Sequence, residues 1–252
     1  MKTAIVTGAS KGIGRAIATR LAQDGVHVVL CARDQALLEE AASEIRQRGG
    51  KASVIALDLR VPTTPAALVD FAISETGRLD LAVSNAGATK RGEFEELTDE
   101  DFADGFALKY FGAVRLTRAA WPHLKAAHGS MIYISGVGGR TPGRQFAIGG
   151  SVNAALFTFT KAIAETGIRD GVQVNCVNPG TIRTARFQAR IDAEARGADA
   201  AAIEKQFVRD QRIARIGEPA DVANLVSFLA SDQGSLLHGA LIDIDSGATK
   251  GI

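Results

Sequence analysis

The chain has 252 residues, a length that one α/β domain can reach, so we expect a single domain over residues 1–252. Its 29 Lys and Arg residues nearly balance its 28 Asp and Glu residues, which argues against a nucleic-acid partner or an anionic membrane surface. No apolar run reaches the ~18 residues of a membrane-spanning helix, and Met1-Lys2 leads directly into a strand pattern, so we expect a cytoplasmic protein that binds small molecules.

Seven short β-rich runs alternate with longer stretches of helical periodicity. Several runs are almost continuous in Val, Ile, Leu and Ala, which is typical of parallel strands buried on both faces. This alternation predicts an α/β fold with one Rossmann-like, doubly wound parallel sheet of about seven strands. In chain order the predicted strands are Ala4–Thr7, Val26–Ala32, Ala52–Asp58, Leu79–Ser84, Ser130–Ser135, Val172–Val177 and Ala240–Asp245.

A long excursion, residues 181–218, follows the sixth predicted strand. In a sheet of this kind, a segment after the carboxyl end of a strand lies over the ligand crevice. We therefore expect residues 181–218 to form a lid on the substrate side.

The cysteines and histidines do not indicate a disulfide or a metal centre. Cys31 and Cys176 fall in separate apolar runs, where a thiol behaves as a small hydrophobic side chain. The four histidines are scattered without the spacing of metal ligands, so we expect no metal.

The first predicted strand runs into a Gly-rich turn, residues 7–14, with the sequence TGASKGIG, and a helical pattern follows. Glycines in such a turn let the backbone approach a ligand closely, and the amides of the helix N-terminus attract phosphate. A tight turn without a ligand is the alternative. The cofactor-binding interpretation assigns contacts to Gly8, Ser10, Lys11, Gly12, Ile13 and Gly14.

The motif Thr-Gly-x-x-x-Gly-x-Gly, together with Ser84-Asn85-Ala86-Gly87 after the fourth strand, resembles the short-chain dehydrogenase/reductase family. Further matches continue to the end of the chain: Asp58-Leu59, Asn178-Pro179-Gly180 with Thr184, Arg215-Ile216-Gly217-Glu218-Pro219 and Asp245-Ser246-Gly247. The resemblance implies that Asp58 and Leu59 contact adenine and that Asn85, Ala86 and Gly87 flank the adenosine ribose. On the nicotinamide side it implies Pro179, Gly180, Ile182 and Thr184.

The end of the second strand indicates which phosphate form of the cofactor is preferred. An acidic side chain there accepts a hydrogen bond from a ribose 2′-hydroxyl and repels a 2′-phosphate. This chain has Ala32 at the usual acidic position, Arg33 beside it and Lys11 in the Gly-rich turn. The two cations predict NADP (NADPH), although Asp34 could pair with Arg33 and the group could be a solvated charge cluster.

The resemblance also implies a catalytic set of Tyr, a Lys four residues later, a Ser and an Asn, which together exchange a proton with a carbonyl/alcohol pair during hydride transfer. Counting back from Asn178-Pro179-Gly180 without gaps places the Tyr position at Gly149, the Lys position at Asn153 and the Ser position at Gly136. The Asn position is Lys109. All four positions therefore hold other residues.

The residue types at the Asn and Lys positions are exchanged. Lys109 is therefore a candidate for holding the nicotinamide ribose or a substrate oxyanion, from the side of the site opposite to the family's Lys. The alternative is a snorkelling Lys109 and a surface amide at Asn153. Gly149 and Gly150 either make room for a bulkier ligand or open a helix ahead of Ser151 as its N-cap.

Two further residues are weaker catalytic candidates. Ser135 precedes the Ser position and points to the other face of a regular strand, so its use would need a bend there. Tyr110, next to Lys109, is a candidate general acid, whereas Tyr133 is expected in the core.

Three functions remain open: an NADP-dependent oxidoreductase with a non-standard proton donor, a cofactor-binding pseudoenzyme or partner subunit, and a lyase or isomerase on the same scaffold. The sequence does not identify the substrate. The resemblance further implies a homotetramer or dimer, with helices over residues 102–120 and 151–165 paired between subunits.

Overall fold

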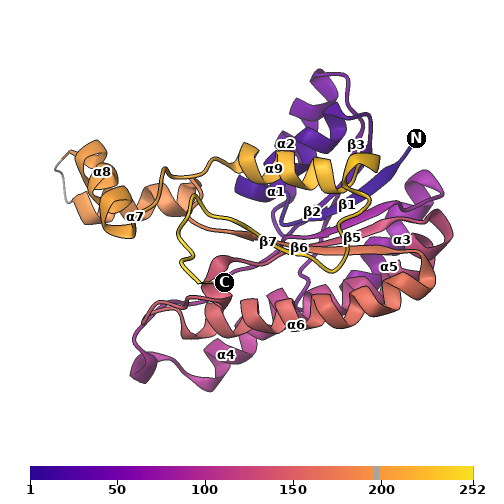
Figure 1. Cartoon of the computed structure of the whole chain (residues 1–252). Helices are drawn as coiled ribbons and strands as arrows, with labels where there is room; N and C mark the ends of the chain where they lie inside the picture. The colour runs from indigo at the N-terminus through magenta and orange to yellow at the C-terminus, as the bar shows by residue number, and fades with distance from the viewer. Residues whose placement is uncertain (196–198, 252) are drawn as a thin grey trace.

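Seven parallel strands form one sheet in the order β3-β2-β1-β4-β5-β6-β7 in the computed structural model, which describes residues 1–195 and 199–251 (Figure 1). The predicted doubly wound sheet is therefore confirmed. The observed strand bounds lie within two residues of the predicted ones; β6, for example, continues to Pro179, where its last residues pair with β7. The strands are β1 (Thr3–Thr7), β2 (His27–Ala32), β3 (Ala52–Ala56), β4 (Leu81–Ser84), β5 (Ser130–Ile134), β6 (Gln173–Pro179) and β7 (Leu241–Ile244).

The central strand β1 shows why these runs form a sheet buried on both faces. All five of its residues are buried, and successive side chains point to opposite faces. Val6 belongs to one core together with Ile17, and Ile5 belongs to the other core together with Leu116. The strand order reverses at β1, between β2 and β4, and the crevice at this switch point is where sheets of this kind bind ligands.

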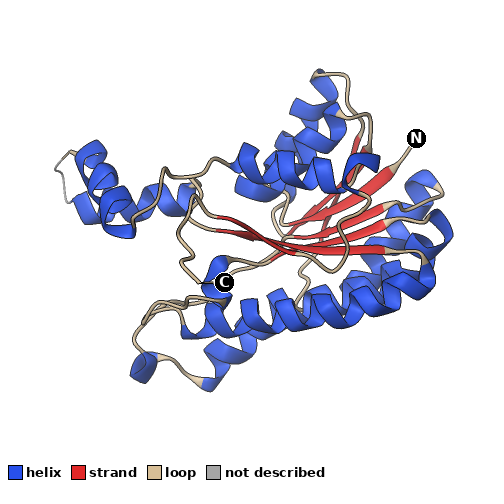
Figure 2. Ribbon diagram, viewed as in Figure 1, coloured by secondary structure: helices blue, strands red, loops and turns tan. Residues whose placement is uncertain are grey.

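Helices cover both faces of the sheet (Figure 2). One layer consists of α1 (Gly12–Gln23), α2 (Gln35–Gln47) and α9 (Pro219–Leu229), and the other of α3 (Thr64–Thr76), α5 (Gly112–Ala127) and α6 (Ala147–Asp170). Near the carboxyl ends of the strands lie the remaining helices, α4 (Asp99–Gly105), the π-helical segment η2 (Phe106–Phe111), α7 (Ala185–Ala195) and α8 (Ala200–Gln211). Short 3₁₀ turns complete the chain: η1 (Phe94–Glu96), η3 (Val137–Gly139) and η4 (Asp232–Gly234).

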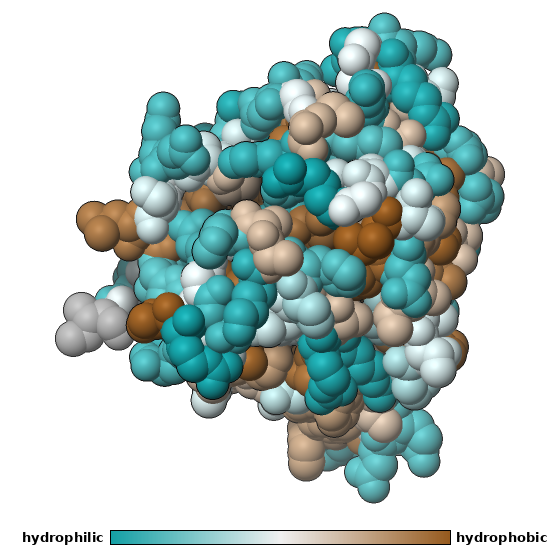
Figure 3. All heavy atoms as spheres, turned by 90° about the vertical axis from the view of Figure 1, so that its right-hand side faces the viewer, coloured by the Kyte–Doolittle hydropathy of each residue, from teal (hydrophilic) through white to brown (hydrophobic). Residues whose placement is uncertain are grey.

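One face of the molecule is largely polar. Figure 3 views the molecule from the side where the N-terminus lies and shows hydrophilic residues over most of this face, with separate hydrophobic patches between them. Within the described ranges, no helix is both long and apolar enough to cross a membrane. Both cysteines are buried as free thiols, Cys31 in β2 and Cys176 in β6, as their apolar surroundings predict.

Candidate functional site

The carboxyl ends of β1 and β4 are tied together by one side chain from each strand end. Thr7 Oγ1 accepts hydrogen bonds from the backbone N–H groups of Asn85, at 2.9 Å, and Ala86, at 3.0 Å. In return, Asn85 Nδ2 donates to the Thr7 carbonyl oxygen at 2.9 Å. The predicted ribose-flanking segment 85–87 therefore lies directly beside the Gly-rich turn.

The Gly-rich turn has a backbone that side chains would obstruct. Gly8 and Gly12 have φ values of +66° and +58°, in the left-handed region that favours glycine. A Cβ atom at Gly14 would overlap the Gly8 carbonyl group. α1 begins at Gly12, and the side chain of its N-cap residue, Lys11, makes no capping hydrogen bond. The first amides of α1 thus remain available for an anion, which fits the pyrophosphate of a dinucleotide.

Near the end of β2, the acidic residue Asp34 caps a helix, while the cations Lys11 and Arg33 remain exposed. Asp34 Oδ1 accepts a hydrogen bond from the Leu37 N–H at 3.1 Å, so this carboxylate caps α2. The alternative pairing of Asp34 with Arg33 is therefore not the arrangement observed. Lys11 and Arg33 are both exposed.

The predicted adenine and nicotinamide contacts lie on loops after β3 and β6. Leu59 is buried, and Asp58 Oδ1 accepts from the Arg60 N–H at 3.0 Å, which fixes the turn after β3. On the other side, a Cβ at Gly12 would lie 3.4 Å from Thr184 Cγ2, so the segment after β6 contacts the Gly-rich turn. Ile182 is held beside Gly217 by an isolated parallel bridge.

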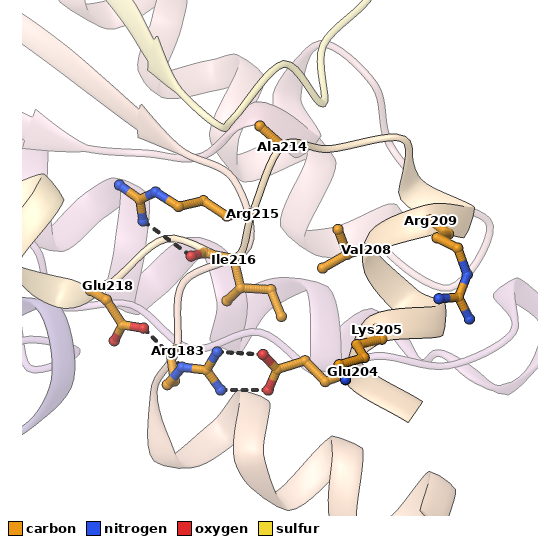
Figure 4. Close-up of a pocket in the computed structure, with 9 residues that line it drawn as sticks. All are labelled: Arg183, Glu204, Lys205, Val208, Arg209, Ala214, Arg215, Ile216 and Glu218. Atoms are coloured by element: carbon orange, nitrogen blue, oxygen red, sulfur yellow. Dashed lines mark hydrogen bonds and ion pairs between the residues drawn. The ribbon is translucent and has the colours of Figure 1, made fainter. Parts of the chain in front are cut away.

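The predicted lid, residues 181–218, contains α7 and α8, while residues 196–198 lie outside the described part of the chain. Within this segment, Arg183 forms ion pairs with two glutamates (Figure 4). Its two terminal nitrogens donate to the two carboxylate oxygens of Glu204, each at 2.5 Å, and its Nε donates to Glu218 at 2.8 Å. These carboxylates raise the pKa of Arg183. Beside the ion pair lies a cavity of about 620 Å³ whose lining includes Val208 and Ile216.

Lys109 points into the protein, so the snorkelling alternative is wrong. Its Nζ donates to the Ser135 carbonyl oxygen at 2.9 Å and to Asn153 Oδ1 at 2.6 Å. Its stem lies over Gly87, where a Cβ would come within 2.9 Å of Lys109 Cδ. Burial lowers the pKa of Lys109 to about 8, the Cys176 thiol opposes this effect, and the positive charge of Arg186 lowers the pKa further.

The local backbone contributes to this placement. Lys109 lies in η2, the π-helical segment between α4 and α5. A π-helical turn widens a helix locally and shifts the side chains of that turn relative to an unbroken α-helix, which is a recurrent device at functional sites. The sequence pattern predicts helix here but does not show the change of period.

Asn153 is 2% exposed, so the prediction of a surface amide is also wrong. A Cβ at Gly136 would come within 2.9 Å of Asn153 Nδ2, so the amide lies against the position where the family has its Ser. Ser135 Oγ donates to the Asn153 carbonyl oxygen at 3.1 Å, which commits this hydroxyl to the backbone of α6. The exchanged pair of Lys109 and Asn153 therefore meets at the carboxyl end of β5.

The ring of Phe146 fills the space at the family's Tyr position. A Cβ at Gly149 would overlap this ring, and a Cβ at Gly138 would crowd its opposite edge. The predicted room for a bulkier ligand at Gly149 is thus occupied. The other interpretation, a helix that starts at Ser151, is wrong as well, because α6 begins at Ala147 and both glycines lie within it.

The two tyrosines lie in aromatic or core surroundings. Tyr110 packs edge-on against Phe106, Phe111 and Phe159, with ring centroids 5.4 to 6.0 Å apart. Tyr133 is fully buried in the core, as predicted, and its hydroxyl lies 2.8 Å from Thr117 Oγ1. Burial raises the pKa of Tyr133, and the hydrogen bond with Thr117 opposes this effect.

Two residues at the site were missed by the sequence reasoning. The Arg91 guanidinium lies over the Phe146 ring, with Cζ 4.3 Å from the ring centroid. The spacing of Phe146 and Gly149 was a usable signal, since residues three apart on a helix are neighbours and a glycine accepts an aromatic ring on its surface. Arg91 lies in a loop, and the sequence offers no pattern that relates it to Phe146.

Comparisons with known proteins agree with this geometry. Residues 8–249 match a family model described as enoyl-(acyl carrier protein) reductase. An uncharacterised oxidoreductase of Mycobacterium tuberculosis is 34% identical over 252 residues, which cover 98% of this chain and 92% of the relative. A diacetyl reductase of Staphylococcus epidermidis that forms (S)-acetoin is 33% identical over 253 residues, covering 98% of each protein.

Solved structures resemble the whole chain. L-sorbose reductase of Gluconobacter frateurii in complex with NADPH and L-sorbose has a TM-score of 0.96 and 31% identity, covering 100% of this chain and 97% of its own. A short-chain oxidoreductase of Pseudomonas aeruginosa PAO1, described as containing an atypical catalytic center, has a TM-score of 0.93 and 28% identity, covering 100% and 98%. Fold, cofactor motifs and relatives together show that this chain belongs to the short-chain dehydrogenase/reductase family.

Proposed function

We propose that the protein is an NADPH-dependent oxidoreductase that interconverts a carbonyl compound and an alcohol, with Lys109 as its principal charged group. The observation that carries the proposal is the position of Lys109 Nζ, held by Ser135 and Asn153 at the carboxyl end of β5, beside the family's Ser and Lys positions. The cofactor-bound relatives support the choice of NADPH, since the structures of both the sorbose reductase and the Pseudomonas oxidoreductase contain it.

When bound, NADPH supplies a hydride to the carbonyl carbon, and the carbonyl oxygen takes up a proton to give the alcohol. The open amides at the start of α1 would hold the pyrophosphate, and Thr184, which lies close to Gly12, would border the nicotinamide side. Lys11 in the Gly-rich turn and Arg33 at the end of β2 are both exposed and available to a 2′-phosphate, whereas Asp34 is occupied as the cap of α2.

Lys109 has the properties required of a group that stabilises an oxyanion or supplies a proton. An ammonium group has three donors, and the bonds to Ser135 and Asn153 use two of them. The third has no partner among residues 1–195 and 199–251, so it can meet a substrate oxygen directly or through one water. Because the pKa of Lys109 is about 8, the group is mostly protonated at neutral pH yet able to release its proton.

The test is transfer of deuterium from NADPH labelled at C4 to the product alcohol, followed by mass spectrometry with a panel of ketones and aldehydes. We expect labelled alcohol from the natural protein and none from the Lys109→Met variant, while Lys109→Arg retains part of the rate because it keeps the positive charge. Reduction should slow as the pH rises through about 8, since the ammonium loses its proton there. Undiminished transfer by Lys109→Met would refute the assigned role.

One observation favours a second function. The Phe146 ring fills the Tyr position, and this side chain has no hydroxyl that could donate a proton to a substrate. This replacement is compatible with a cofactor-binding pseudoenzyme or partner subunit. In that case NADPH binds, as followed by its fluorescence, but no label is transferred to any carbonyl. A lyase or isomerase that forms a Schiff base on Lys109 would instead be trapped covalently by borohydride in the presence of substrate.

We also propose that the protein assembles as a homotetramer or dimer through the helices over residues 102–120 and 151–165. Phe111 supports this proposal, because it is a large apolar side chain on the first of these helices with 45% of its surface exposed. Light scattering measures the mass directly, and a monomer at micromolar concentration would refute the proposed assembly.

A further inference from the structure

The loop that follows β3 contacts the chain on both sides of η2. Arg60 Nε and Nη2 donate to the two carboxylate oxygens of Asp104, in the last turn of α4, the second of these bonds at 2.9 Å. On the other side of η2, Arg115 Nη1 donates to the Arg60 carbonyl oxygen at 3.3 Å. A Cβ at Gly112, the first residue of α5, would lie 3.5 Å from the Leu59 carbonyl oxygen. Arg60 therefore contacts the end of α4 through its side chain and the first turn of α5 through its carbonyl group.

The loop itself is held firmly in place. Asp58 Oδ1 accepts from the Arg60 N–H at 3.0 Å, and the Asp58 carbonyl oxygen accepts from Thr64 Oγ1 at 2.7 Å. Leu59 is buried in the same core as Ala113 of α5. The position of this loop is thus set by its own hydrogen bonds and by the core, so the loop can fix the helices that contact it.

Holding both helices fixes the rotation of α4 relative to α5. One residue added to an α-helix turns everything after it by about 100°. A π-helical turn accommodates an extra residue by widening locally, and such turns are rare outside functional sites. The segment Phe106–Phe111 therefore keeps its wider turn while α4 and α5 both stay against the loop after β3. If α4 is released, η2 can return to an α-helix, and Lys109 then turns away from Ser135 and Asn153.

The other contacts of α4 do not replace the pair of Arg60 and Asp104. Lys90 Nζ donates to Asp101 Oδ2 at 2.7 Å, which holds the first turn of α4 against the loop after β4. Gly105 lies against Ile148 of α6, and an apolar contact of this kind has no preferred direction. A bidentate pair of Arg and a carboxylate does fix an orientation. Within residues 1–195 and 199–251, Asp104 accepts a hydrogen bond only from Arg60.

We propose that Arg60 is a positioning residue for Lys109, acting through its bidentate pair with Asp104, which holds η2 in its π-helical turn. The inference rests on the proposed oxidoreductase function, in which Lys109 meets the substrate. Besides burial, the groups that act on the pKa of Lys109 are the Cys176 thiol in β6 and Arg186 in α7. Arg60 is not one of them, so its influence on Lys109 passes through the backbone of η2.

The experiment measures the pKa of Lys109 itself, in the full-length protein without cofactor. The protein is labelled with ¹³C at lysine Cε, whose chemical shift follows protonation, and the Lys109 signal is the one missing from Lys109→Met. We expect a midpoint of about 8 in the natural protein. In Arg60→Gln and in Asp104→Asn the midpoint should rise by about one unit or more, because an ammonium released from the interior reaches water.

The two variants separate positioning from a direct effect of charge. Loss of the Arg60 charge alone would raise the pKa of Lys109, whereas loss of the Asp104 charge alone would lower it. A rise in both variants supports positioning, and any other result overturns it. The matched control is Arg78→Gln, which breaks another bidentate pair, with Asp80 just before β4, and should leave the midpoint at about 8. If Arg78→Gln raises the midpoint as well, the effect is a general loss of stability and the inference is wrong.

Deuterium transfer from labelled NADPH is the second readout. The rate in Arg60→Gln should fall about tenfold to a hundredfold, since a small displacement of a catalytic group is costly. The pH at which reduction slows should rise together with the pKa of Lys109. A raised pKa in a protein that transfers no deuterium to any carbonyl keeps the inference and refutes the oxidoreductase. Transfer that requires Lys109, with an unmoved pKa in both variants, does the reverse.

Discussion

Replacing Lys109 with Met has an effect on stability that depends on pH in a predictable way. Burial holds the pKa of Lys109 at about 8 in the folded protein, against 10.5 for an ordinary lysine. A lowering of this size corresponds to about 3 kcal/mol by which the fold disfavours the ammonium. Between about pH 8 and 10.5 the unfolded chain therefore binds more protons than the native protein, and the stability contribution of Lys109 rises with pH across that window.

Met cannot titrate and fills much of the volume of the lysine stem. At neutral pH the variant escapes the penalty of about 3 kcal/mol but leaves Asn153 Oδ1 and the Ser135 carbonyl without their donor, at a cost of about 1–3 kcal/mol for each buried group. These effects oppose each other, so we expect the natural protein and Lys109→Met to differ by no more than about 3 kcal/mol at pH 7. At pH 10.5 the natural protein should have gained about 2–3 kcal/mol relative to Lys109→Met.

Urea unfolding at a series of pH values measures this difference, with the fluorescence of Trp121, the single tryptophan, as the signal. Comparing two proteins that differ at one position cancels the titration of all other groups. The matched control is Lys161→Met, at an exposed lysine on α6, whose curve should run parallel to that of the natural protein. If the Lys109→Met curve is also parallel, Lys109 Nζ reaches water and the buried geometry is wrong.

Three further predictions concern the Tyr position, the cofactor and the lid. Gly149→Tyr should destabilise the fold when Phe146 is kept, because the new side chain overlaps the Phe146 ring. Introducing the family's Ser, Tyr and Lys at Gly136, Gly149 and Asn153 should produce ketone reduction only when Phe146→Ala is added. Ketone reduction by the triple variant with Phe146 present would contradict the overlap. Arg33→Ala should weaken NADPH binding by about 1.5–3 kcal/mol and leave NADH binding unchanged, as calorimetry can show; equal losses for both would exclude contact with the 2′-phosphate. Arg183→Ala should release α8, which carries Glu204, from the segment that follows β6, so limited proteolysis should cleave residues 185–215 faster than in the natural protein. An unchanged rate would show that the ion pair does not hold the predicted lid in place.

The strands and the cofactor half could be predicted from the sequence because their determinants are local. A run of buried Val, Ile and Ala residues defines a parallel strand wherever it pairs, and the turn around Gly8 and Gly12 requires glycine whatever surrounds it. The short capping side chain of Asp34 also acts within three residues. Features that depend only on residues close together in the chain can be read from the sequence.

The catalytic half was decided by contacts between distant segments. The same linear pattern allowed Lys109 to reach water, yet the structure places its ammonium against Ser135 and Asn153, 26 and 44 residues away. The space inferred at Gly149 is filled by the ring of Phe146, because protein interiors are close-packed and a neighbouring side chain occupies the space that a glycine leaves. Local composition therefore determined the sheet and its dinucleotide turn, and only the tertiary packing determined which charges face the site, since burial and charge proximity depend on residues that the chain brings together after it folds.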